Sequence, residues 1–264
     1  MAVAQAQMIN PYEDAPEEEL VQLCQRLLPG VPVRVKEGFI EADLIQPGRD
    51  NHGVIRELVA SLRHHYPEAG RHYWSVRAWG LLIWQPVLLA VLASEVISKR
   101  LNLMCLGQRR EGTMVAGMVL ERGLLPAGND SRDEAASHLR RVCDSVLDEL
   151  GEVVRINPVL ARRLLADRIL ATLLRIRPLL ADDSPAYTCR LAVQWLKASG
   201  LEEASALMEI ELPARNVGLA LDRKGCCQHY RRTDGALCKT CPRQPMALRI
   251  KRLQEEWSLD AGAE

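Results

Sequence analysis

Four of the eight cysteines in this 264-residue chain lie within a stretch of sixteen residues. They are Cys226, Cys227, Cys238 and Cys241, and their spacing is C-C-x10-C-x2-C. The two thiolates of a C-x2-C turn can reach a common iron or zinc ion. Adjacent side chains normally diverge, so the convergence of Cys226 and Cys227 requires an irregular backbone, for which Gly225 is well placed. The pattern therefore predicts a metal site.

The residues alone leave the metal open. Four thiolates satisfy either one tetrahedral zinc ion or the two irons of a [2Fe–2S] cluster, and unrelated free thiols are a third alternative. A disulfide framework is not expected. The first residues, MAVAQAQMINPYEDAPEEE, have neither the basic nor the apolar region of an export signal, and the cytosol is reducing. We therefore expect a cytoplasmic protein that uses these cysteines as metal ligands.

Basic residues surround the cysteines. The stretch 222–252 contains nine basic residues and only two acidic ones. Such charges can offset a negatively charged metal centre, or dock an acidic protein or an anionic ligand; they are equally compatible with a solvated face. The candidate docking residues are Arg223, Lys224, Arg231, Arg232, Lys239 and Arg243.

The cysteine segment resembles the C-terminal motif of the FhuF-type ferric-siderophore reductases in residue order, in both spacings and in its position near the C-terminus. The close resemblance covers about residues 217–244. The apolar stretch 74–91 is also similar to a helix in the middle third of that family. The resemblance implies that Cys226, Cys227, Cys238 and Cys241 bind a [2Fe–2S] cluster.

The same resemblance implies the activity. It predicts a cytoplasmic enzyme that reduces the Fe(III) of a siderophore, of the hydroxamate type, by one electron and so releases Fe(II). No catalytic residue beyond the cluster is expected. The chain has no GxGxxG, no P-loop and no nucleophile elbow, so electrons should come from a separate ferredoxin, flavodoxin or flavin reductase.

Two other functions use the same residues. The chain could be a non-catalytic iron–sulfur protein, either an electron carrier or a sensor of iron or redox state. It could also contain a structural four-cysteine zinc knuckle. The long region before the cysteines favours the enzyme, because a simple electron carrier needs far less protein.

Composition is ordinary for a soluble globular protein, with 48% apolar and 26% charged residues and a net charge of zero. Nothing in it favours a nucleic-acid partner. The longest apolar run, 78–94, is too short for a membrane span and is interrupted by Gln85-Pro86, so we expect a buried helix rather than a transmembrane segment. Aromatic residues are scarce at 4%, which favours a core of aliphatic residues in helices.

The helices and strands expected along the sequence predict a helix-rich α+β fold. Before residue 125 we expect helices at 16–28, 54–65 and 74–100, short strands at VPVRV and FIEADLI, and a hairpin formed by 101–108 and 113–121. After it, helices should begin at Ser131, Asn157-Pro158 and Ser184-Pro185, where capping residues stand. A strand at 217–221 and a helix at 246–257 should follow. We divide the chain into a body, 1–214, that contributes to siderophore binding, and a cysteine module, 215–264.

Overall fold

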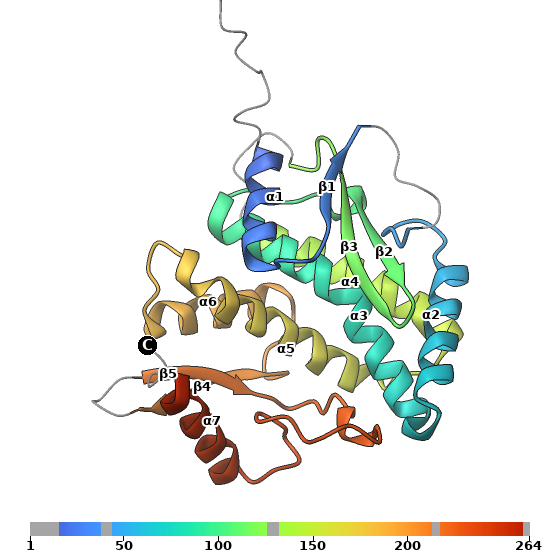
Figure 1. Cartoon of the computed structure of the whole chain (residues 1–264). Coiled ribbons are helices and arrows are strands. Elements are labelled where there is room, and N and C mark those ends of the chain that lie inside the picture. Colours follow the sequence, from blue (N-terminus) through green and yellow to red (C-terminus); the bar gives the residue numbers. More distant parts are fainter. Residues whose placement is uncertain (1–15, 38–43, 126–131, 213–216, 261–264) are drawn as a thin grey trace, which may run out of the picture.

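The computed structural model describes residues 16–37, 44–125, 132–212 and 217–260. Its α-helices are α1 Pro16–Leu27, α2 His52–His65, α3 Gly70–Leu92, α4 Arg132–Val153, α5 Pro158–Ile176, α6 Pro185–Ala198 and α7 Met246–Asp260. Its strands are β1 Val33–Lys36, β2 Leu106–Glu111, β3 Met114–Glu121, β4 Ala206–Glu211 and β5 Val217–Asp222. Helices outweigh the short strands (Figure 1), which confirms the expected helix-rich α+β class.

A small mixed sheet with strand order β1-β3-β2 lies at one end of the molecule (Figure 1). The antiparallel β2–β3 pair is the expected hairpin, and β1 runs parallel to β3. The strand expected at FIEADLI falls mostly on residues 38–43, outside the described residues. Beyond that gap, Ile45 forms an isolated antiparallel bridge with Gln108.

Helix α3 lies at the centre of the body, where it packs against α2, α4, α5 and β3. Most of its side chains are apolar, and most of these are buried, including Trp79, Leu82 and Leu89. By length and composition the stretch Pro67–Ile97 could cross a membrane, yet 67% of its most apolar window is buried inside the protein. This burial fits the expected core helix.

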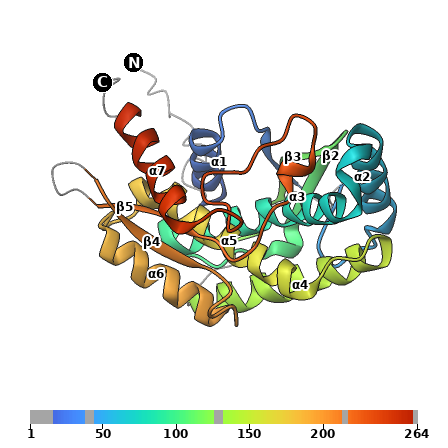
Figure 2. The ribbon, with the colours of Figure 1, turned by 90° about the horizontal axis from the view of Figure 1, so that it is seen from below.

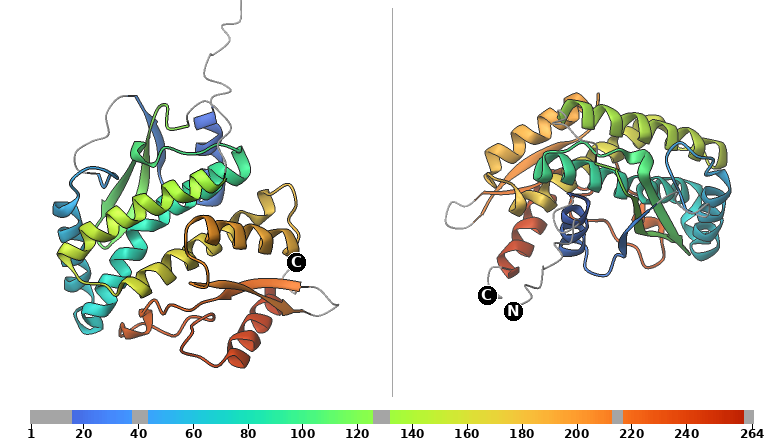
Figure 3. Two further views of the ribbon diagram at one scale, coloured as in Figure 1. Left: turned by 180° about the vertical axis from the view of Figure 1, so that it is seen from behind. Right: turned by 90° about the horizontal axis from the view of Figure 1, so that it is seen from above.

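Helices α4 and α5 pack against α3, and α6 packs against α4 and α5 (Figure 3). Two of their starts were predicted from capping residues, and both are confirmed. The Asn157 side chain accepts a hydrogen bond from the Leu160 N–H, and Ser184 accepts one from the Tyr187 N–H. Ser131 lies outside the described residues.

Strands β4 and β5 form a second, two-stranded sheet that packs on α5 and α6. Strand β4 was not expected, because Leu207, Met208 and Glu209 are good helix formers, and pairing with β5 makes them extended. Helix α7 packs on this hairpin, where Gly218 leaves room for the Trp257 ring. The boundary at 214/215 falls between the paired strands and outside the described residues.

Glu95 ties three helical segments together. It lies in the π-helical turn Ala93–Ile97 after α3, and its side chain is only 2% exposed. Arg132 donates to both carboxylate oxygens at 2.6 and 2.8 Å, and the Trp195 indole N–H donates at 2.8 Å. This single carboxylate therefore joins the end of α3 to α4 and α6.

We predict that Glu95→Ala lowers the free energy of unfolding by about 3 kcal/mol, because it leaves Arg132 and the buried Trp195 N–H without their acceptor. Urea denaturation measures this. Glu57→Ala is the control, because Glu57 is 65% exposed in its pair with Arg110 and should cost less than about 1 kcal/mol. Equal costs for the two variants would contradict the prediction.

Candidate metal centre

The cysteine segment follows β5 and lies over α5 and the N-terminal half of α3 (Figure 2). Between β5 and α7 the chain contains only one short 3-10 turn, His229–Arg231. Gly225 is packed against α5 so closely that an added Cβ would lie 3.1 Å from the Arg163 Cβ and 3.3 Å from Leu160. A side chain at this position would require its neighbours on α5 to shift, so the packing favours glycine immediately before the paired cysteines.

The four thiols form two pairs. The sulfurs of Cys226 and Cys241 are 3.8 Å apart, and the Cys238 thiol donates a hydrogen bond to Cys227. The C-x2-C turn favoured Cys238 and Cys241 as partners, whereas the fold pairs each of them with one of the adjacent cysteines. The positive φ of Gln228 turns the chain sharply after the adjacent cysteines.

The protonation of the thiols differs between the pairs. The hydrogen bond from Cys238 lowers the pKa of Cys227 to about 5, helped by the His229 backbone N–H and by the charge of Arg223. The same hydrogen bond raises the pKa of Cys238. Burial raises the pKa of Cys226 to about 11. In the pair of Cys227 and Cys238, Cys227 is therefore favoured as a thiolate even without a metal. Thiolates are the form that metals bind.

A buried ion pair supports the second pair of cysteines from the helical body. Asp167 on α5 is 4% exposed, accepts from the Arg223 Nε at 2.8 Å and accepts from the Ser205 hydroxyl at 2.6 Å. Burial raises the pKa of Asp167, while Arg223 and Ser205 act to lower it. The other end of the guanidinium donates to the Cys238 sulfur at 3.7 Å. Arg223 therefore connects the body directly to a candidate ligand.

The donor set fits a two-metal group. Two sulfurs bound to one tetrahedral metal lie about 3.8 Å apart, as Cys226 and Cys241 do. Two thiol pairs match the two irons of a [2Fe–2S] cluster, each of which takes two thiolates.

The comparison with known families supports an iron–sulfur centre. Residues 223–243 match the family model described as the FhuF 2Fe-2S C-terminal domain. The chain carries a FhuF-type [2Fe–2S] C-terminal domain. The match begins at Arg223 and includes all four clustered cysteines, so the resemblance found in the sequence is confirmed over these residues. No solved structure matches the chain.

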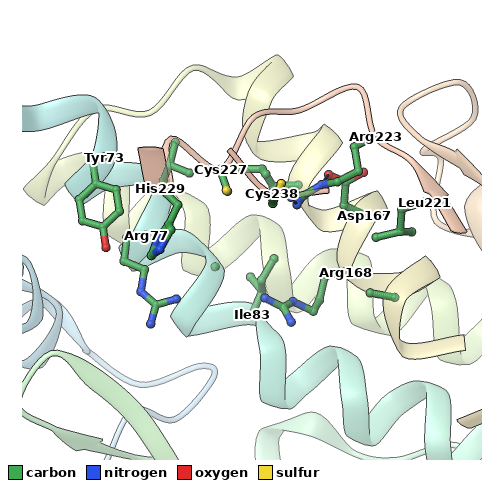
Figure 4. Close-up of a pocket in the computed structure, with 14 residues that line it drawn as sticks. Tyr73, Arg77, Ile83, Asp167, Arg168, Leu221, Arg223, Cys227, His229 and Cys238 are labelled. Atoms are coloured by element: carbon green, nitrogen blue, oxygen red, sulfur yellow. Dashed lines mark hydrogen bonds and ion pairs between the residues drawn. The ribbon is translucent and has the colours of Figure 1, made fainter. Parts of the chain in front are cut away.

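A cavity of about 290 Å³ lies between the FhuF-type domain and the helical body (Figure 4). Cys227 and Cys238 line it, together with His229 from the same segment. The body contributes Tyr73 and Arg77 from α3, and Asp167 and Arg168 from α5 to the same wall. One thiol pair therefore faces open space, whereas Cys241 of the other pair is only 1% exposed.

The six basic residues suggested by the sequence do not form one patch. Arg223 is held by Asp167, and Lys224 donates to the Glu203 carbonyl. Arg232 pairs with Asp234 and lies 4.2 Å from the Tyr66 ring centroid, and Lys239 pairs with Glu256. Arg231 and Arg243 stack on Tyr230 and line a second cavity on the same segment. Among the described residues, Lys224, Arg231 and Arg243 are exposed without an ion pair, and only the two arginines of these three share one aromatic ring.

Sequence reasoning missed Tyr73, Arg77, Asp167 and Arg168. Two of them carried a signal. Arg77 is the charged residue within the otherwise apolar stretch 74–91, and Asp167 stands among the buried residues of α5. A charge on a buried helical face needs a partner or a function. Only the fold shows that Arg77 and Asp167 lie beside the cysteines.

The four scattered cysteines stay apart from this centre. Burial raises the pKa of Cys24 to about 12 and also raises the pKa of Cys143, Cys105 and Cys189. Such thiols stay protonated at neutral pH and serve packing.

We predict that Arg223→Gln lowers the reduction potential of the cluster by some tens of millivolts, because it removes a positive charge and an N–H donor from the Cys238 sulfur. Dye-mediated titration followed by EPR measures the potential. Arg223→Lys, which keeps the charge, should lower it less. Arg243→Gln, a basic residue of the same segment that stacks on Tyr230, should leave it within about ten millivolts. An unchanged potential in Arg223→Gln would refute the tuning role.

Proposed function

We propose that this chain is a cytoplasmic ferric-siderophore reductase that transfers one electron to the Fe(III) of a hydroxamate-type siderophore and releases Fe(II). One observation carries the proposal: within a FhuF-type [2Fe–2S] domain, one pair of candidate ligands, Cys227 and Cys238, lines a cavity. A chelate in this cavity lies next to the metal centre. When bound, the cluster supplies the single electron.

The chemistry of iron explains why one electron is sufficient. Hydroxamate oxygens are hard donors and hold the small, highly charged Fe(III) tightly, whereas they hold the softer and less charged Fe(II) far less tightly. The protein therefore needs no acid or base to break a covalent bond. Its residues have to bind the chelate, keep it close to the centre and set the potential of the centre.

The four cysteines are proposed as ligands in the pairs that the fold creates. Cys226 and Cys241 would hold one iron, on the side buried against α5, and Cys227 and Cys238 the other, on the side of the cavity. Arg223, hydrogen-bonded to Cys238, acts on the cavity-facing iron.

A separate ferredoxin, flavodoxin or flavin reductase is proposed as the electron donor. Arg231 and Arg243 both lie against the Tyr230 ring, and both are exposed and make no ion pair among the described residues, so we propose them as docking residues. Acidic surfaces are steered toward such residues over a Debye length of about 10 Å.

We predict that the protein purified without oxygen contains about two irons and two sulfides per chain and gives an EPR signal on reduction. In its reduced form it should convert a ferric trihydroxamate to the ferrous state. Cys238→Ala and Cys241→Ala, which remove a ligand outright, should lose most of the cluster, whereas Cys189→Ala, in a scattered thiol, should keep it.

Two results would overturn this function. A colourless protein with one zinc and no cluster after reconstitution with iron and sulfide would leave a structural knuckle. A full cluster that reduces no ferric chelate in a single turnover would leave an electron carrier or a sensor.

The pairing has a test of its own. Serine in place of one cysteine changes the Mössbauer parameters of the iron that it binds. We predict that Cys226→Ser and Cys241→Ser perturb the same iron site of ⁵⁷Fe-loaded protein. Cys227→Ser and Cys238→Ser should perturb the other iron site. Grouping of 238 with 241, the two ends of the C-x2-C turn, would contradict the proposed pairs.

A further inference from the structure

The cavity beside Cys227 and Cys238 has an excess of positive charge. Three arginines line it, Arg77, Arg168 and Arg223, against one acidic residue, Asp167. Asp167 is already engaged by Arg223 and by the Ser205 hydroxyl. The cavity therefore presents the charges of Arg77 and Arg168 without a carboxylate of its own to balance them.

Arg77 and Arg168 come from different helices that pack together, α3 and α5. The Arg77 guanidinium donates to the Met114 sulfur at 3.2 Å, a weak acceptor, and no carboxylate pairs with it among the described residues. The Arg168 guanidinium makes no ion pair within the same ranges. In Figure 4 both guanidinium groups extend into the space below the two cysteines.

Two neighbouring cations without counter-charges repel each other, and this cost is relieved when negative charge enters between them. Reduction creates such a charge. Three hydroxamates, each with one negative charge, make a neutral complex with Fe(III), and the same complex with Fe(II) carries one negative charge. A group that attracts the product more strongly than the substrate favours the reduction.

We propose that Arg77 and Arg168 receive the iron-bearing face of the ferric chelate and stabilise the negative charge that it gains on reduction. This inference rests on the proposed function and adds the residues and the electrostatic mechanism to it. A cavity of about 290 Å³ is at the small end of ligand sites, so it admits one face of a hexadentate chelate rather than the whole molecule.

The step balances with one electron. A cluster held by the four cysteines would receive one electron from a one-electron protein donor and would supply it to the chelate, whose Fe(III) becomes Fe(II). No covalent bond to the protein forms or breaks. The ferrous ion then leaves as protons from water take its place on the hydroxamate oxygens.

The variants Arg77→Gln and Arg168→Gln, singly and together, test the proposal. Arg175→Gln is the matched control, because Arg175 lies two turns further along α5, is exposed, and does not line the cavity. Each protein is first compared with the wild type for iron content, circular dichroism and cluster potential. Arg77→Lys, which keeps the charge, should restore most of any loss.

The first readout is binding without electron transfer. A trihydroxamate loaded with Ga(III) is neutral, like the substrate, and the same ligand loaded with Zn(II) carries one negative charge, like the product. Calorimetry on the holoprotein should show tighter binding of the zinc complex. The double variant should lose this preference by about tenfold, while Arg175→Gln keeps it.

The second readout is the single-turnover rate from the pre-reduced protein to a ferric trihydroxamate. We expect the double variant to slow at least tenfold at unchanged cluster potential. Wild-type rate and charge preference in the double variant would overturn the inference and leave the reductase function intact. A drop in cluster potential that accounts for the slower rate would also overturn it. A wild-type protein that reduces no ferric chelate would instead refute the proposed function itself.

Discussion

The buried ion pair between Asp167 and Arg223 is the contact on which the site depends. A carboxylate that is 4% exposed is costly unless a cation accompanies it, so α5 requires Arg223 at this place. Arg223 is the first residue after β5, and its position fixes where the cysteine segment begins. The same guanidinium reaches the Cys238 sulfur. One interaction thereby positions the segment on the body and places a positive charge on a candidate ligand.

The two faces of the centre differ in polarity. On one face, Gly225 lies against Leu160 and Leu164 of α5, and Cys241 is buried. On the other, Cys227 and Cys238 look into a cavity lined with arginines. The apolar residues of α5 form a low-dielectric surface on one side of the centre, and the arginines of the cavity place positive charge on the other. Negative charge is therefore stabilised best on the side of the cavity. The direction of electron transfer that we propose follows from this asymmetry.

Local signals in the sequence predicted a large part of the fold. Asn157 and Ser184 start helices because their side chains cap nearby N–H groups, and this is visible without tertiary structure. The cysteines were recognisable for the same reason, since their spacing is a local property. Strand β4 was missed because its partner, not its composition, makes it extended.

The cavity could not be derived in the same way. Arg77 and Arg168 are separated from the cysteines by many residues, and only the packing of α3 on α5 brings them beside the same thiols. Likewise, the spacing favoured a common metal for the C-x2-C turn, whereas the fold pairs its two cysteines with different neighbours. Pairing across a loop depends on the turn at Gln228, which the sequence pattern does not specify.

The near absence of regular structure between Asp222 and Met246 links this protein to the iron supply of its cell. A segment with one 3-10 turn has few backbone hydrogen bonds of its own. Four metal–thiolate bonds would stabilise it in place of the hydrogen bonds of a helix or a sheet. A group that binds only the folded state adds its binding free energy to folding. The abundance of the protein would then follow cluster assembly, so that a cell unable to build iron–sulfur centres accumulates less of it, whatever its rate of synthesis.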